Sequence, residues 1–203
     1  MKIGIMGGTF DPIHNGHLTL GRAALMQYSL DEVWFMPNGN PPHKGNVAAP
    51  IAARCKMTEL AIRDIKEFRL ELYEADQKKV SYSYKTLEHF HETRKADKFY
   101  FIIGADSLFM IESWVKPEKI FPVCTLLAAC RDEVSTPEKM NGQINYLRKT
   151  YGAEIGILKA PLMPVSSHEL RKWIKSGKDF SSYVPDKVAE YIKKEGLYGA
   201  KDK

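Results

Sequence analysis

Cysteine is scarce in this chain of 203 residues, which holds three, at Cys55, Cys124 and Cys130. An odd number at scattered positions excludes a disulfide framework, and no pair has the spacing of a zinc ribbon. We therefore expect all three to be small residues of the core. The sequence also lacks any apolar run near the ~20 residues that a membrane-crossing helix needs. Because no apolar signal segment stands at the N-terminus either, we expect a cytosolic protein.

A concentrated basic stripe is also missing. Thirty Lys and Arg against 25 Asp and Glu give a net charge of +5, which suits anionic ligands but is too small and too dispersed for a nucleic-acid-binding surface. A hydrophobic fraction of 44% is ordinary for a globular chain that can bury a sizeable core. We expect a single domain over residues 1–203, with a core over 1–165 and C-terminal helices over 166–203.

Apolar runs alternate with helical patterns along the chain. Strands are expected at residues 3–6, 32–36, 68–73, 99–103, 123–129 and 155–158. Helices are expected at 15–28, 51–65, 85–94 and 137–151, and two more close the chain at about 166–177 and 185–196. The first of these two begins at Ser166-Ser167-His168-Glu169, which is a capping-box pattern. Because strands separated by helices need crossover connections, the pattern predicts an α/β fold with a doubly wound, mainly parallel sheet. Such sheets bind ligands beyond the C-terminal ends of their strands.

The loop after the first expected strand is the most informative stretch. Gly7 and Gly8 let the backbone approach a ligand that a Cβ would block. A helix is expected to open near Asn15, so that its N–H groups and the positive end of its dipole face the same crevice. His14 and His17 lie three residues apart, on one face of the first helical turn. Together these groups suit a polyphosphate.

Two other interpretations of this loop remain. A tight strand-to-helix turn with one structural histidine needs no ligand, and the glycines alone would favour it. Two histidines at this spacing can also ligate zinc, although no Cys, Asp or Glu nearby follows a ligand spacing. A Walker loop and the dinucleotide fingerprint are excluded, because neither Gly-Lys-Ser/Thr nor Gly-x-Gly-x-x-Gly is present here.

The segment Gly8-Thr9-Phe10-Asp11-Pro12-x-His14-x-Gly16-His17 resembles the signature of the nucleotidylyltransferase superfamily. Over nearly its whole length the chain is similar to the bacterial nicotinate mononucleotide adenylyltransferases. The further matching segments are 34–44, 104–106, 166–171 and 184–199. The superfamily motif fixes only the reaction type. Another adenylyl- or cytidylyltransferase, such as a pantetheine-phosphate adenylyltransferase, therefore stays an alternative, as does a non-catalytic nucleotide sensor.

The resemblance implies a Rossmann-like fold and adenylyl transfer from ATP to nicotinate mononucleotide in NAD biosynthesis. Mg²⁺ would be held mainly through the ATP phosphates. The implied catalytic residues are His14, His17, Lys44 and Arg171. The implied ATP contacts are Gly8, Thr9, Phe10, His14, Gly16, His17, Gly104, Asp106, Ser166, Ser167 and Arg171. The implied mononucleotide contacts are His43, Lys44, Arg54, Tyr82, Ser83 and Trp114.

Several of these residues also have an ordinary structural interpretation. Asp106 can cap the next short helix as well as meet a ribose, and Trp114 without the family match would be a core residue. The chain departs from the family pattern at Lys85 and His168, where Asp and Ser or Thr are usual. No nucleic-acid or membrane partner is expected, and formation of a homo-oligomer is left open.

Overall fold

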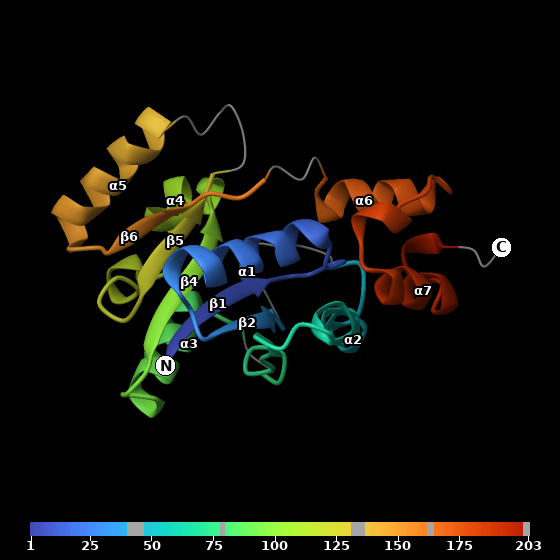
Figure 1. Ribbon diagram of the computed structural model, residues 1–203, viewed down its shortest axis with the longest axis horizontal. Helices are drawn as coiled ribbons and strands as arrows, with labels where there is room; N and C mark the ends of the chain where they lie inside the picture. The colour runs from blue at the N-terminus through green and yellow to red at the C-terminus, as the bar shows by residue number, and fades with distance from the viewer. Residues whose placement is uncertain (40–46, 78–79, 131–136, 162–164, 201–203) are drawn as a thin grey trace.

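The computed structural model describes residues 1–39, 47–77, 80–130, 137–161 and 165–200 (Figure 1). It contains a six-stranded sheet with the order β3-β2-β1-β4-β5-β6. All neighbouring strands run parallel, which confirms the predicted α/β fold with a doubly wound sheet. The strand order reverses between β1 and β4, and in such sheets this switch point is the usual place for a ligand.

The strands are β1 (Lys2–Gly8), β2 (Glu32–Pro37), β3 (Phe68–Leu70), β4 (Lys98–Gly104), β5 (Thr125–Ala129) and β6 (Ile155–Leu158). The helices are α1 (Asn15–Tyr28), α2 (Ile51–Ile62), α3 (Ser83–Thr93), α4 (Ala105–Met110), α5 (Pro137–Tyr151), α6 (Ser167–Lys175) and α7 (Asp186–Lys194). Single 3₁₀ turns are η1 (Ile111–Ser113), η2 (Pro117–Lys119), η3 (Ser181–Tyr183) and η4 (Leu197–Gly199).

β3 is shorter than the predicted strand over residues 68–73. Its regular pairing ends at Leu70, and the Glu71 side chain then accepts the backbone N–H of Tyr73 at 2.9 Å. Asp76 N–H next donates to the Leu72 carbonyl at 3.0 Å, which closes a turn. A local side-chain contact therefore competes with the strand ladder and ends it early.

Side chains alternate between two hydrophobic clusters, one on each face of the sheet. On β1, Ile3 and Ile5 belong to one cluster, and Met6 belongs to the other. The first cluster is covered by α3, α4 and α5, and the second by α1, α2, α6 and α7. This period of two with both faces buried is what a parallel sheet requires. In Figure 1 α6 and α7 lie together at the end of the molecule away from the N-terminus.

The three cysteines differ in burial. Cys124 is buried, and burial raises the pKa of its thiol to about 12. Cys55 and Cys130 are only partly buried, so the expectation of a core position is confirmed for Cys124 alone. Within the described residues, no helix combines the length and the apolar sequence needed to cross a membrane. The predicted division of the chain into a core and C-terminal helices of one domain stays a prediction.

Candidate functional site

A pocket of about 850 Å³ lies beyond the C-terminal ends of β1 and β4, at the switch point of the sheet. Its volume is typical of a site for a small molecule or cofactor. The predicted site residues that line it are Gly8, Thr9, Phe10, His14, His17, Tyr82, Ser83, Gly104, Asp106, Trp114, Ser166, Ser167 and Arg171. Gly16 and Arg54 do not line it. His43 and Lys44 lie outside the described residues.

The two histidines cap α1 reciprocally. Nδ1 of His14 accepts the backbone N–H of Gly16 at 3.2 Å, and Nδ1 of His17 accepts the backbone N–H of His14 at 3.1 Å. Because a backbone N–H can only donate, each Nδ1 is an acceptor, and the proton of each neutral imidazole is on Nε2. The ring centroids are 3.8 Å apart, and both residues line the pocket. The helix cap therefore sets the tautomer that a phosphate oxygen requires.

Phe10 supports this pair from the side. Its ring meets the His17 ring edge-on, with centroids 5.0 Å apart, and only 2% of the residue is exposed. A Cβ at Gly8 would lie 2.9 Å from the Phe10 ring. Glycine is therefore needed at position 8 to make room for the Phe10 ring, in addition to the close approach of a ligand that the sequence suggested.

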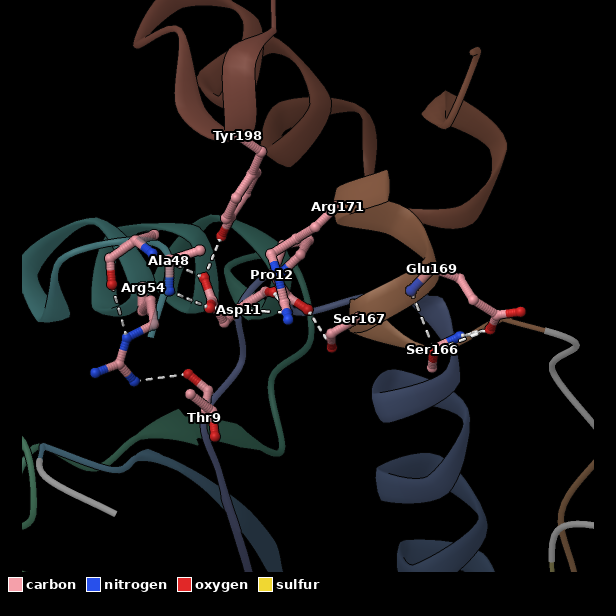
Figure 2. A network of polar contacts seen from close by, with 11 residues as sticks. Thr9, Asp11, Pro12, Ala48, Arg54, Ser166, Ser167, Glu169, Arg171 and Tyr198 are labelled. Atoms are coloured by element: carbon pink, nitrogen blue, oxygen red, sulfur yellow. Dashed lines mark hydrogen bonds and ion pairs between the residues drawn. The ribbon is translucent and has the colours of Figure 1, made fainter. Parts of the chain in front are cut away.

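Asp11 joins four segments of the chain (Figure 2). Its buried carboxylate accepts the N–H of Ala48 at 2.8 Å, the N–H of Ala49 at 3.1 Å and the hydroxyl of Tyr198 at 2.7 Å. Nη1 of Arg171 lies 3.8 Å from Oδ2 and donates to the backbone carbonyl of Asp11 at 2.7 Å. A buried carboxylate needs such partners. The sequence gives no sign that Asp11 has a partner 187 residues away.

The N-terminus of α6 is attached to the same loop. Ser166 and Glu169 form the predicted capping box, in which the Ser166 hydroxyl accepts the Glu169 N–H at 3.2 Å and Glu169 accepts the Ser166 N–H at 2.8 Å. The hydrogen bonds from Ser166 lower the pKa of the Glu169 carboxyl. The Ser167 hydroxyl donates to the Pro12 carbonyl at 2.9 Å. A helix N-terminus and the Arg171 guanidinium thus face the pocket together, an arrangement that suits an anion.

Arg54 ties loops together beneath the pocket. It is 1% exposed, and its guanidinium donates to the carbonyls of Thr9 at 2.7 Å, Ala49 at 3.2 Å and Gly39 at 3.5 Å. Burial lowers the pKa of Arg54, and the nearby Asp11 carboxylate opposes that shift. The structure does not bring Arg54 to the pocket wall, and its predicted contact with a mononucleotide stays a prediction.

The wall of the pocket also contains Trp114 and an acidic residue that sequence reasoning missed. Trp114 is half-buried there, edge-on to Phe101 with ring centroids 6.2 Å apart. Glu74, which is 3% exposed, accepts the Thr86 hydroxyl at 2.7 Å and the Asn38 amide at 3.0 Å. Burial raises the pKa of Glu74. No sequence signal distinguishes Glu74 from the other acidic residues.

Ser81 and Asp106 complete the polar part of the wall. The Ser81 hydroxyl is buried and has no hydrogen-bond partner in the described part of the chain. Asp106 is exposed on the pocket wall in the first turn of α4, whose N-cap is Gly104. Asp106 is therefore not the cap of that helix, which was its structural interpretation. Across the described ranges, no group of three or more His, Cys, Asp or Glu side chains is placed to hold a metal ion.

Comparison with known proteins places the chain among the nucleotidyltransferases. Residues 5–173 match the model of the cytidylyltransferase-like family. A relative from Clostridium kluyveri, named "Probable nicotinate-nucleotide adenylyltransferase", is 38% identical over 201 residues, which are 98% of this chain and 99% of the relative. A relative of the same name from Clostridium botulinum (strain Okra) is 38% identical over 195 residues, which are 96% and 97% of the two chains.

Solved structures agree on the fold. The nicotinic acid mononucleotide adenylyltransferase of Plasmodium falciparum complexed with NaAD superposes with a TM-score of 0.79 over 98% of each chain, at 21% identity. The chain belongs to the cytidylyltransferase-like family. Within it, the full-length relatives place the chain among the nicotinate-nucleotide adenylyltransferases.

Proposed function

We propose that this chain transfers the adenylyl group of ATP to the phosphate of nicotinate mononucleotide, giving nicotinate adenine dinucleotide and pyrophosphate in NAD biosynthesis. The observation that carries the proposal is one pocket lined both by groups that suit a polyphosphate and by an aromatic side chain that suits a flat base. The first groups are His14, His17 and the N-terminus of α6, and the aromatic side chain is that of Trp114. We assign the polyphosphate to one end of the pocket, beside the histidines, and the base to the other end, beside Trp114. The full-length relatives support this choice of reaction.

The reaction needs no general base from the protein. An oxygen of the acceptor phosphate attacks the α-phosphorus of ATP, and this oxygen–phosphorus bond forms as the bond from the α-phosphorus to the bridging oxygen breaks. The electron pair leaves with pyrophosphate. A phosphate monoester is already ionised near pH 7. The obstacle is repulsion between two anions, so catalysis consists of positioning and charge neutralisation.

Each group at the polyphosphate end has a role in this scheme. The Nε2–H donors of His14 and His17 meet the α- and β-phosphates, and they stabilise the negative charge that develops as the bond breaks. The N-terminus of α6 and the Arg171 guanidinium meet the far end of the triphosphate. The remaining predicted ATP contacts on the wall are Gly8, Thr9, Phe10, Gly104, Asp106, Ser166 and Ser167.

The acceptor occupies the other end. The Trp114 ring stacks on the pyridine, and the backbone N–H groups near Tyr82 and Ser83 at the start of α3 receive its carboxylate. His43 and Lys44, which lie outside the described residues, keep their predicted contact with the acceptor phosphate.

Mg²⁺ is part of the proposal, held mainly through the phosphate oxygens of ATP. This fits the donor set, because the described residues offer no cluster of three or more metal-ligating side chains. When bound, the ion supplies positive charge to the phosphates. A cytosolic location and a single domain over residues 1–203 complete the proposal.

The test is a reaction with ATP, Mg²⁺ and one acceptor at a time: nicotinate mononucleotide, nicotinamide mononucleotide or 4′-phosphopantetheine. Pyrophosphate release and dinucleotide formation are followed together. We expect the highest kcat/KM with nicotinate mononucleotide, and loss of both signals in a His14→Ala/His17→Ala variant. A faster reaction with another acceptor would contradict the assigned substrate. ATP binding without pyrophosphate release from any acceptor would indicate a nucleotide sensor.

A further inference from the structure

A second, shallower groove opens beside the main pocket. Its volume is about 290 Å³, at the lower end for a small-ligand site. Its lining residues are Ala48, His168, Arg171, Lys172, Lys175 and Tyr198. His168 and Arg171 also line the main pocket, so the two hollows meet at the side of α6.

The groove follows one positively charged face of α6. Positions 168, 171, 172 and 175 have the i, i+3, i+4 and i+7 spacing of a single helix face. Like charges at these spacings repel each other. Within the described residues, neither Lys172 nor Lys175 has a carboxylate within ion-pair distance. The fold therefore tolerates this concentration of cations without pairing the two lysines.

Two acidic groups lie beside this face and have several partners of their own, and Oδ2 of Asp11 is 3.8 Å from Nη1 of Arg171. The Asp11 carboxylate accepts hydrogen bonds from Ala48, Ala49 and Tyr198 below the groove. Glu169 accepts the N–H and the hydroxyl of Ser166 in the cap of α6. An outside anion is the natural counterion for a cationic groove of this kind.

We propose that this groove binds the inorganic pyrophosphate that leaves the main pocket after adenylyl transfer. The inference rests on the proposed function, because that reaction forms pyrophosphate. Arg171, held at the junction by its 2.7 Å hydrogen bond to the Asp11 carbonyl, serves both hollows. Lys172 and Lys175 lie farther along the helix, away from its N-terminus. Their compact ammonium groups suit a small, highly charged anion.

The test measures pyrophosphate binding by titration calorimetry in the absence of other substrates. The variant is Lys172→Ala/Lys175→Ala. The matched control is Lys149→Ala/Lys194→Ala, which removes the same charge from exposed positions on α5 and α7. We expect the Kd of pyrophosphate to rise roughly tenfold in the groove variant and less than about twofold in the control. The Kd of a non-hydrolysable ATP analogue should change less than about threefold in both.

Three results would overturn the proposal. The first is an unchanged pyrophosphate Kd in the groove variant, and the second is an equal rise of that Kd in the control variant. The third is an equal rise of the Kd for the ATP analogue in the groove variant, which would assign the lysines to the bound triphosphate. The binding measurement needs no turnover, so it is separate from the acceptor assay. If the chain transfers adenylyl groups but the groove variant binds pyrophosphate as tightly as the wild type, only the proposed groove site is refuted. If the groove variant binds pyrophosphate more weakly but the chain transfers no adenylyl group, the proposed reaction is refuted and the groove remains a site for anions.

Discussion

The hydroxyl of Tyr198 donates to Oδ1 of Asp11 at 2.7 Å and so connects η4, near the C-terminus, to the loop that follows β1 (Figure 2). Burial, followed by the nearby Asp11 carboxylate, raises the pKa of Tyr198, so the hydroxyl stays protonated and can donate at neutral pH. Arg171 donates to the carbonyl of the same aspartate. The C-terminal segment thus belongs to the support of the proposed triphosphate site.

Replacing Tyr198 by Phe removes this hydroxyl and keeps the ring. Because a buried carboxylate then loses a donor, we expect the free energy of unfolding to fall by about 1.5–3 kcal/mol, measured by urea denaturation. Tyr191→Phe on α7 is the control, since Tyr191 is also half-buried and makes no side-chain hydrogen bond within the described residues. An equal fall in the free energy of unfolding of the two variants would show that the hydrogen bond to Asp11 does not stabilise the folded chain.

His17 has two separable roles, in the helix cap and in the chemistry. His17→Ala removes the acceptor of the His14 N–H and a proposed donor to the phosphates. We expect kcat to fall by roughly 10²–10³, with a much smaller change in the KM for ATP. The free energy of unfolding should fall by about 1 kcal/mol.

His17→Glu separates these roles. Glutamate at this position can restore the reciprocal cap, but it has no donor and places negative charge beside the phosphates. Stability should therefore recover above that of His17→Ala, while kcat stays at or below the alanine value. Near-normal turnover in either variant would remove the imidazole from the chemistry.

Trp114→Ala tests the acceptor end of the pocket. Stacking on a base contributes ~1–3 kcal/mol, so the Kd for nicotinate mononucleotide should rise about 5- to 150-fold, measured by fluorescence or calorimetric titration. ATP binding should hardly change, and Trp114→Phe should retain most of the affinity for the mononucleotide. If ATP affinity falls by the same factor, Trp114 is a packing residue instead.

We predict that Glu74 makes the free energy of unfolding depend on pH. Burial raises its folded pKa above the value of the unfolded chain, so the folded state binds its proton more tightly. The stability of the wild type relative to Glu74→Gln should therefore decrease as pH rises from the unfolded value of about 4.5 through the raised folded value. Urea denaturation of both proteins across this range measures the difference. A constant difference would show that Glu74 does not titrate as its burial requires.

Local signals in the sequence predicted much of the fold. The bounds of α1, α5 and β6 match the prediction, because apolar periodicity and neighbouring turn residues mark their ends. The capping box of Ser166 and Glu169 was predicted from residue types alone and is confirmed. β3 was predicted too long, because the sequence did not show that Glu71 would capture the Tyr73 N–H.

The site was predicted less completely, for two physical reasons. The capping box of His14 and His17 uses imidazole nitrogens, which are outside the usual set of capping groups. The contact of Asp11 with Tyr198 forms only in the folded chain, and no pattern in the sequence indicates that the two residues meet. Sequence reasoning found residues with distinctive chemistry, such as His14 and His17. It missed the role of residues such as Tyr198, whose partner is far away in the sequence.

The central claim is that the loop after β1 and the N-terminus of α6 hold a triphosphate. The most direct measurement is a crystal structure with a non-hydrolysable ATP analogue and Mg²⁺. We predict phosphate oxygens within hydrogen-bond distance of Nε2 of His14 and His17 and of the first N–H groups of α6. A triphosphate bound away from residues 8–17, or one from which both imidazole rings are turned aside, would contradict the account.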